Sequence, residues 1–239
     1  MIIINNLENT TIWDFPERGK WLNHDGKYRG NWSPHVPKNL IIRYSSKGDI
    51  VLDQFIGGGT TLIEACRLER KCIALDINEN AIKLCNQKIK IFDGKEQAFI
   101  GKCDARNLSI IKENSIDLIC THPPYANIIK YSKDNINDIS LLDLDEFYVA
   151  MKDVARSCYR VLKNKKYCCI LIADIRKKGF IEPLGFNVMN IFIEQGFRLK
   201  EIIIKKQNNC KSTDKWKEIS KDRNIYLIEH EYLFVFYKG

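Results

Sequence analysis

The sequence reads Ser115-Ile116-Asp117-Leu118-Ile119-Cys120-Thr121-His122-Pro123-Pro124-Tyr125 near the middle of its 239 residues. The apolar run before Thr121 predicts a buried strand. Two consecutive prolines cannot continue a sheet ladder, because neither has an N–H group and the φ angle of both is fixed. The chain must therefore leave the sheet in a stiff turn. Open α/β sheets bind their ligands in loops at the carboxyl ends of parallel strands, so we expect this loop to form part of an active site.

Strands and helices alternate on both sides of this segment, which is typical of a doubly wound α/β fold. The expected strands cover residues 49–53, 72–76, 98–100, 115–120, 167–173, 197–204 and 231–237, and the expected helices cover 60–69, 80–91, 144–162 and 183–195. A polar loop without a clear helix joins the last two strands, so they should pair antiparallel. The sequence thus predicts a mainly parallel, seven-stranded sheet with an antiparallel C-terminal strand, in a single domain from 1 to 239.

The composition favours a globular cytoplasmic protein. Hydrophobic residues make up 45% and charged residues 28% of the chain, and no apolar run reaches the roughly 18 residues of a membrane span. The first residues lack the basic region of a signal peptide. Nine cysteines include no CxxC pair, and several of them, such as Cys120 and Cys168, lie in apolar runs. This pattern is typical of buried, reduced thiols rather than of disulfides or zinc ligands, so we expect no metal.

Positive charge is concentrated in two segments of the chain. The formal net charge is +8, of which residues 18–43 carry a net +5 and residues 200–223 a net +4, so that the remainder is about neutral. Basic residues mixed with aromatic ones favour contacts with phosphates and unstacked bases, although a solvated surface over packed tryptophans would have the same composition. The candidates for nucleic-acid contacts are Arg29, Trp32, Lys205, Lys206 and Trp216.

A glycine-rich loop follows the first predicted strand and reads Asp53-Gln54-Phe55-Ile56-Gly57-Gly58-Gly59-Thr60-Thr61. Its pattern is neither G-x-G-x-x-G nor that of a phosphate loop, which argues against dinucleotides and nucleoside triphosphates. Acidic residues follow three successive strands: Asp53 would suit a cationic amino group, Asp76 two ribose hydroxyls, and Asp104 an adenine amino group. Although each alone is also a common turn residue, together they predict an adenosine cofactor with a positive charge and no phosphate.

These motifs together resemble those of the S-adenosylmethionine-dependent amino-methyltransferases that modify DNA at cytosine N4 or adenine N6. The glycine-rich loop is similar to the family's D-P-F-x-G-S-G-T-T, with glutamine for proline and glycine for serine. The segment from Thr121 to Tyr125 is similar to T-S-P-P-Y, with histidine for serine. Pro37-Lys38-Asn39-Leu40 is similar to the family's P-x-x-L element, and the segment 230–238 to its closing strand. The resemblance implies a Rossmann-like methyltransferase fold and S-adenosyl-L-methionine as cofactor.

The resemblance also implies roles for individual residues. The cofactor-binding residues would be Asp53, Phe55, Gly57, Gly59, Thr60 and Thr61 around the methionine end, and Asp76, Ile77, Asp104 and Ala105 around the adenosine end. The catalytic residues would be His122, Pro123, Pro124 and Tyr125.

In the family's mechanism, the side chain before the double proline and a carbonyl within it accept hydrogen bonds from the target amine. Here the acceptors would be His122 and the Pro123 carbonyl, while Tyr125 would stack on a base flipped out of double-stranded DNA. Methyl transfer is then an in-line displacement that depends on positioning. Because only neutral imidazole can accept, we expect activity to fall as the pH drops through the pKa of His122, and a flat profile from about pH 5 to 8 would count against this role.

The sequence thus favours a site-specific DNA methyltransferase that acts on cytosine N4, with adenine N6 as the first alternative. An RNA amino-methyltransferase and a non-catalytic module that binds S-adenosylmethionine and nucleic acid also stay open, because basic segments hardly separate DNA from RNA and because Gln54 and His122 depart from the family pattern. DNA recognition would use an N-terminal arm, residues 1–43, and loops near 126–143 and 207–224. These parts are small, so a homodimer or a separate recognition subunit would complete recognition.

Overall fold

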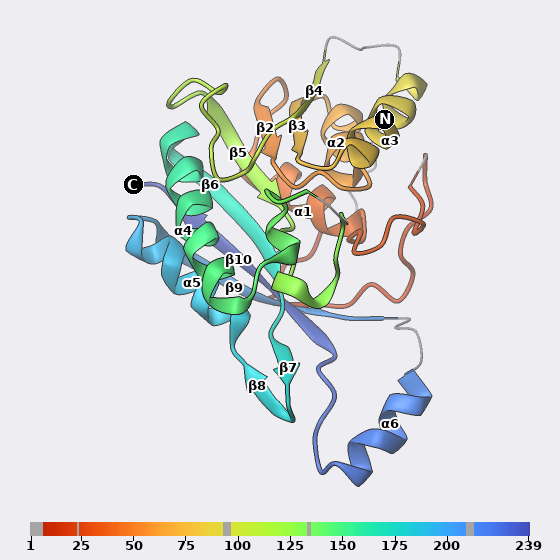
Figure 1. Ribbon diagram of the computed structural model, residues 1–239. Coiled ribbons are helices and arrows are strands. Elements are labelled where there is room, and N and C mark those ends of the chain that lie inside the picture. Colours follow the sequence, from red (N-terminus) through yellow and green to blue (C-terminus); the bar gives the residue numbers. More distant parts are fainter. Residues whose placement is uncertain (1–6, 23, 93–96, 133–134, 209–212) are drawn as a thin grey trace.

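The computed structural model describes residues 7–22, 24–92, 97–132, 135–208 and 213–239, and an eight-stranded sheet forms its centre (Figure 1). The strands are β1 (Ile12–Trp13), β2 (Ile50–Asp53), β3 (Lys71–Asp76), β4 (Ala98–Lys102), β5 (Ile116–Thr121), β6 (Leu162–Ile172), β9 (Arg198–Lys206) and β10 (His230–Tyr237), in the order β1-β9-β10-β6-β5-β2-β3-β4. A separate hairpin consists of β7 (Ile175–Lys177) and β8 (Phe180–Glu182).

Helices cover both faces of the sheet. They are α1 (His35–Tyr44), α2 (Thr60–Arg67), α3 (Glu79–Lys88), α4 (Leu144–Val161), α5 (Leu184–Glu194) and α6 (Thr213–Asp222), with short 3₁₀ turns η1 (Ile89–Ile91), η3 (Ala126–Ile128) and η4 (Ile139–Leu141). Alternate residues along a strand point to opposite faces, so Val51 of β2 belongs to a core cluster with residues of α1, α2 and α3, whereas Leu52 belongs to a second cluster with residues of α4 and α5. None of the helices in the described ranges is long and apolar enough to span a membrane.

The sheet topology places the site. Strands β2 to β6 run parallel to one another, and β10 lies antiparallel between β6 and β9. The carboxyl ends of β2, β3, β4 and β5 therefore meet at one edge of the sheet, where the glycine loop and the double proline lie. The predicted doubly wound, mainly parallel sheet with an antiparallel C-terminal strand is confirmed.

The structure corrects this prediction in several places. The sheet has an eighth strand, because β1 adds parallel to β9, and two residues are too short to give a periodic signal. The connection between β9 and β10, predicted without a clear helix, contains α6. This helix is mostly polar, and its large apolar residues are Trp216 and Ile219. Strand β6 begins at Leu162, directly after α4, rather than at residue 167. The sequence did not indicate this earlier start, because residues 163–166 are all polar. Neither α1 nor the hairpin β7–β8 was predicted.

Candidate active site

A cavity opens at the carboxyl ends of β2, β3, β4 and β5, among residues from seven separate stretches of the chain. Its lining comprises Tyr28, Gly30–Trp32, Gln54–Gly58, Asp76–Asn78, Cys103–Ala105, His122, Pro124, Tyr131 and Asn137–Ile139. Six of the predicted cofactor residues lie in this lining: Phe55, Gly57, Asp76, Ile77, Asp104 and Ala105. The structure thus brings together residues from both predicted ends of a cofactor site. We call this the cofactor cavity.

The other predicted cofactor residues, Asp53, Gly59, Thr60 and Thr61, are not part of this lining. The Asp53 carboxylate is buried and accepts hydrogen bonds from the hydroxyls of Thr61 and Thr121, each at 2.6 Å, and from the Phe55 N–H at 3.0 Å. Burial raises the pKa of Asp53 to about 6. Asp53 therefore ties the glycine loop to the end of β5, and its predicted contact with the cofactor's amino group stays a prediction.

Aromatic and polar side chains of the N-terminal arm lie directly on the glycine loop. A Cβ atom at Gly57, where φ is +47°, would lie 3.0 Å from the Tyr28 ring, and one at Gly58 would lie 2.9 Å from the Asn31 side-chain amide. Asn31 also accepts a hydrogen bond from the Thr60 hydroxyl at 2.6 Å. The missing Cβ atoms therefore make room for the arm, which forms the outer wall of the cofactor cavity.

Buried polar contacts hold this arm in place. Glu64 on α2 is fully buried, accepts a hydrogen bond from the Trp21 indole at 2.7 Å, and contacts His24 at 2.7 Å. Arg67 pairs with the same carboxylate. Arg18 donates to the carbonyl oxygens of residues 31 and 32, both at 2.7 Å. These contacts fix the part of the arm that lines the site.

Two of the predicted catalytic residues, His122 and Tyr125, form a chain of polar contacts with Glu231 and Lys205. His122 Nε2 lies 2.8 Å from the Tyr125 hydroxyl, which donates to the Glu231 carboxylate at 2.8 Å. Glu231 in turn pairs with the Lys205 ammonium at 2.8 Å. Burial raises the pKa of Glu231, but the attraction of Lys205 and the hydrogen bonds from Lys205 and Tyr125 outweigh this and leave the pKa below its usual value. Glu231 is therefore an ionised acceptor that orients Tyr125.

Burial lowers the pKa of His122 to about 4. The imidazole is therefore neutral at pH 7, the state that a hydrogen-bond acceptor requires. Trp32 stacks on it, with ring centroids 5.6 Å apart and planes at 25°, while Tyr125 meets it edge-on. From the sequence, a flat activity profile from about pH 5 to 8 would have counted against His122. Because the imidazole gains its proton only near pH 4, the loss of activity is now expected at that lower pH.

A second cavity of about 430 Å³ adjoins the first one. All four predicted catalytic residues line it, together with Phe15, Arg18, Gly26, Gly30–Ser33, Ile129, Tyr131, Lys205, Gln207, Asn208 and Glu231. His122 and Pro124 belong to both linings. We call this the substrate-side cavity.

The structure separates the predicted nucleic-acid contacts into two groups. Trp32 and Lys205 lie inside the site, the first buried against His122 and the second paired with Glu231. Arg29 and Lys206 are exposed, although Lys206 lies 3.3 Å from Asp14, and Trp216 is 48% exposed on α6. The predicted recognition loops partly lie outside the described residues, at 133–134 and 209–212, as do positions 1–6 and 23 of the arm.

Several residues of the site gave no recognisable signal in the sequence. Asp138 and Tyr131 come from a polar loop without a motif, and their place in the cofactor cavity depends on tertiary folding. Tyr28 and Asn31 lie in the basic segment, where composition indicated only a binding surface. Glu231 is different, because an acidic residue in an otherwise apolar closing strand could have marked a buried functional group.

The sequence profile of the DNA methylase family matches residues 4–87 and 116–239. The chain belongs to this family. A second profile, described as RNA cap guanine-N2 methyltransferase, matches the central residues 48–171. The first match includes the double-proline loop and the closing strands, so the predicted amino-methyltransferase resemblance is confirmed.

This DNA methylase chain matches parts of longer methyltransferases. The Type II methyltransferase M.MjaII of Methanocaldococcus jannaschii is 23% identical over 209 residues, which are 87% of this chain and 32% of that protein. The DNA adenine methyltransferase YhdJ of Escherichia coli is 33% identical over 102 residues, 41% of this chain and 34% of that protein. The chain thus spans about a third of the length of these relatives.

Solved structures share the fold. TrmN from Thermus thermophilus superposes with a TM-score of 0.61 at 19% identity, covering 88% of this chain and 50% of that one. A geranyl diphosphate methyltransferase in complex with S-adenosylmethionine has a TM-score of 0.60 at 8% identity, covering 87% and 86%. Family and fold are those of S-adenosylmethionine-dependent methyltransferases, which confirms the predicted cofactor.

Proposed function

We propose that this DNA methylase chain transfers a methyl group from S-adenosylmethionine to an exocyclic base amine in double-stranded DNA, with cytosine N4 as the favoured target and adenine N6 as the alternative. The observation that carries the proposal is the meeting of the two cavities at His122 and Pro124. A methyl donor in the cofactor cavity and a flipped base in the substrate-side cavity would come together at this point, and positioning of this kind drives an in-line transfer.

The cofactor cavity fits the proposed cofactor. Gln54 Oε1 and Asp138 Oδ2 both lie in buried side chains of its lining, and neither atom has a hydrogen-bond partner in the described part of the chain. S-adenosylmethionine carries hydroxyl and amino donors that such acceptors need, and it brings a positive charge to an acidic cavity. When bound, the cofactor supplies a methyl group on a sulfonium.

The chain's own residues would prepare the base for attack. The lone pair of an exocyclic amine is delocalised into the ring, and an acceptor for each amine hydrogen would draw it back towards the nitrogen. The Tyr125 hydroxyl gives its one proton to Glu231, so His122 Nε2 donates to Tyr125, and the other ring nitrogen of the neutral imidazole would be the acceptor for the amine. The Pro123 carbonyl would offer the second acceptor. Glu231 holds the Tyr125 hydroxyl, so the ring that would stack on the base is fixed in advance.

The alternatives have support of their own. The relative YhdJ is named as a DNA adenine methyltransferase, which favours adenine N6 as the second target. The RNA cap guanine-N2 profile supports an RNA substrate, although its match leaves out the closing strands that the DNA methylase profile includes. Recognition of a specific DNA sequence would still call for a second copy or a separate subunit beside the small arm and loops.

The purified chain should transfer radiolabelled methyl groups from S-adenosylmethionine to unmethylated duplex DNA. Transfer to RNA but not to DNA would replace the proposed substrate with the RNA alternative. Calorimetry provides the second readout, because a chain that binds no S-adenosylmethionine cannot be the proposed enzyme.

The hairpin β7–β8 is a candidate DNA contact at the same edge of the sheet as the site. It projects from the carboxyl end of β6, and α6 projects nearby (Figure 1). Lys177 and Lys178 are exposed, without an ion pair in the described ranges, and Phe180 beside them is 80% exposed. Exposed lysines next to an exposed aromatic ring suit a phosphate backbone.

We predict that the K177A/K178A variant binds duplex DNA about tenfold more weakly and shows a salt dependence of binding reduced by roughly two ion equivalents. Affinity for S-adenosylmethionine should stay unchanged, because the hairpin is remote from the cofactor cavity lining. The matched control is K90A/K112A, which removes two exposed lysines that precede β4 and β5, at the opposite edge of the sheet. Equal DNA affinity of the two variants would refute the hairpin contact.

A further inference from the structure

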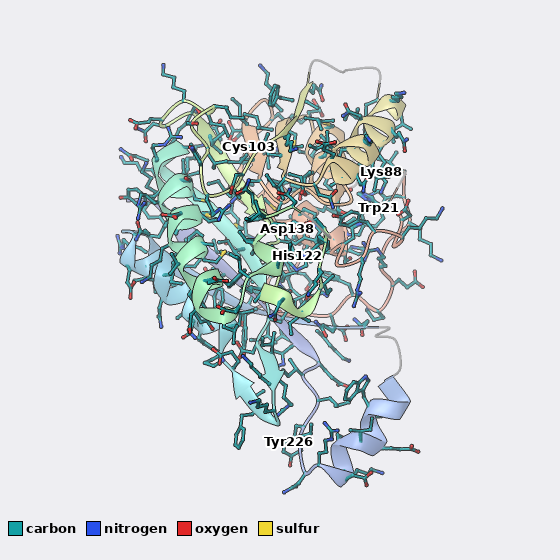
Figure 2. All side chains as sticks on the ribbon, viewed as in Figure 1. Trp21, Lys88, Cys103, His122, Asp138 and Tyr226 are labelled. Atoms are coloured by element: carbon teal, nitrogen blue, oxygen red, sulfur yellow. The ribbon has the colours of Figure 1, made fainter. Side chains whose placement is uncertain are left out.

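Asp138 is a buried acid in the wall of the cofactor cavity (Figure 2). It is 4% exposed, and its Oδ1 atom accepts a hydrogen bond from the Ser140 N–H at 2.9 Å. Its Oδ2 atom has no hydrogen-bond partner in the described ranges. A buried carboxylate oxygen without a partner is costly, so this atom is a candidate acceptor for a donor on the ligand.

Asp104, the acid that the sequence predicted for the adenine amino group, is already paired. The Arg106 guanidinium donates to both of its carboxylate oxygens, at distances of 2.6 to 3.1 Å. Arg106 also donates to the side chain and the carbonyl of Asn137, each at 3.3 Å. Arg106 therefore takes up the carboxylate oxygens of Asp104, and it also holds Asn137, the residue before Asp138.

Further hydrogen bonds hold the loop that carries Asp138 against the cofactor cavity. Asn78 donates to the Tyr131 carbonyl at 3.0 Å, and Asn135 donates to the Ile77 carbonyl at 3.4 Å. The Tyr131 N–H donates to the Ser140 hydroxyl at 3.1 Å. Residues around Asp138 are thus bound to the loop after β3, on the cofactor side of the molecule.

We propose that Asp138 Oδ2 accepts a hydrogen bond from the amino group of the cofactor's adenine. Three apolar side chains, Ile77, Ala105 and Ile139, line the same cavity and suit the faces of a flat base. The inference rests on the proposed use of S-adenosylmethionine. It gives part of the loop 126–143, predicted for DNA recognition, a role in cofactor selection.

Calorimetry with two ligands tests this assignment without catalysis. The ligands are S-adenosylhomocysteine and its analogue whose purine lacks the 6-amino group. The wild-type chain should bind S-adenosylhomocysteine about 10-fold to 100-fold more tightly, the usual effect of a hydrogen bond to a charged acceptor. In D138N an amide N–H replaces one acceptor oxygen while the hydrogen bond to Ser140 can persist, so this variant should bind both ligands equally.

D104N tests the rival acceptor. It should keep the wild-type preference for the amino-bearing ligand, because the remaining amide oxygen can still accept from Arg106 and so keep the loop of Asp138 in place. A preference retained in D138N, or lost in D104N alone, would overturn the assignment to Asp138. If the wild-type chain binds neither ligand, the proposed function itself fails, and this result is distinct from the other two. D138A provides a second variant, and thermal unfolding of both variants separates a loss of binding from a loss of folding.

Discussion

The H122A variant is expected to transfer methyl groups about a hundredfold more slowly than the wild type, the usual effect of removing one preorganised hydrogen bond at a reacting group. His122 is neutral at pH 7, lies between Trp32 and Tyr125, and borders both cavities. Loss of its acceptor nitrogen leaves the amine lone pair delocalised. Single-turnover rates at saturating DNA and cofactor measure this effect separately from binding.

Two further substitutions at position 122 distinguish chemistry from packing. H122F keeps an aromatic ring against Trp32 but has no acceptor, so it should be as slow as H122A. H122N offers a carbonyl acceptor and should recover part of the rate. An H122F variant that reacts at the wild-type rate would exclude His122 as the acceptor.

The pH profile of the wild-type reaction follows from the same residue. Because burial lowers the pKa of His122 to about 4, the rate should be flat with respect to His122 from about pH 6 to 8 and fall as the pH drops towards 4. The unfolded chain takes up this proton nearer pH 6.5, so protonation of the unfolded state also lowers stability as the pH falls from about 6.5 to 4. Stability measured over this range therefore has to accompany the rates.

Replacement of Glu231 by alanine is expected to lower the free energy of unfolding by about 3–5 kcal/mol, the cost of removing one partner from a buried ion pair. The Lys205 side chain is 13% exposed and would lose its carboxylate, and the Tyr125 hydroxyl would lose its acceptor. Urea unfolding at pH 7 measures the change. E231Q keeps an acceptor for Tyr125 but not the charge, so its loss should be smaller.

The control for this effect is E79A, which removes one partner of an exposed pair, Glu79 and Lys102, whose side chains are 63% and 53% exposed. Exposed pairs of this kind contribute about 0–1 kcal/mol. Removing both buried partners in K205M/E231L should restore much of the stability lost in E231A. An E231A variant as stable as E79A would show that the chain from Lys205 to His122 does not hold the site together.

The sequence predicted the parts of the site that follow from strand ends. Buried apolar runs located the strands, and the double proline and glycine loop marked where they end, so Asp76, Asp104 and His122 were correctly expected at one edge of the sheet. The direction of each side chain was not predictable. Asp53 accepts a hydrogen bond from Thr121, a partner 68 residues away, which no local pattern indicates.

Residues that depend on long-range packing were missed for the same reason. Asp138 reaches the cofactor cavity because Arg106 and Asn78 fasten its loop, and no local pattern encodes those contacts. The pairing of Lys205 with Glu231 depends on two antiparallel neighbours, β9 and β10. Charge counting marked Lys205 as a candidate nucleic-acid contact, but it could not show that the Glu231 carboxylate lies beside it.

The central claim is that this DNA methylase chain methylates an exocyclic amine of DNA at a site built around His122. The most direct measurement is mass spectrometry of nucleosides from the DNA of a methylation-free host that expresses either the wild-type chain or H122F. We predict N4-methylcytosine with the wild type and a much smaller amount with H122F, while N6-methyladenine in its place would keep the mechanism and change the target base. DNA without any methylated base, from cells whose purified chain binds S-adenosylmethionine, would contradict the account.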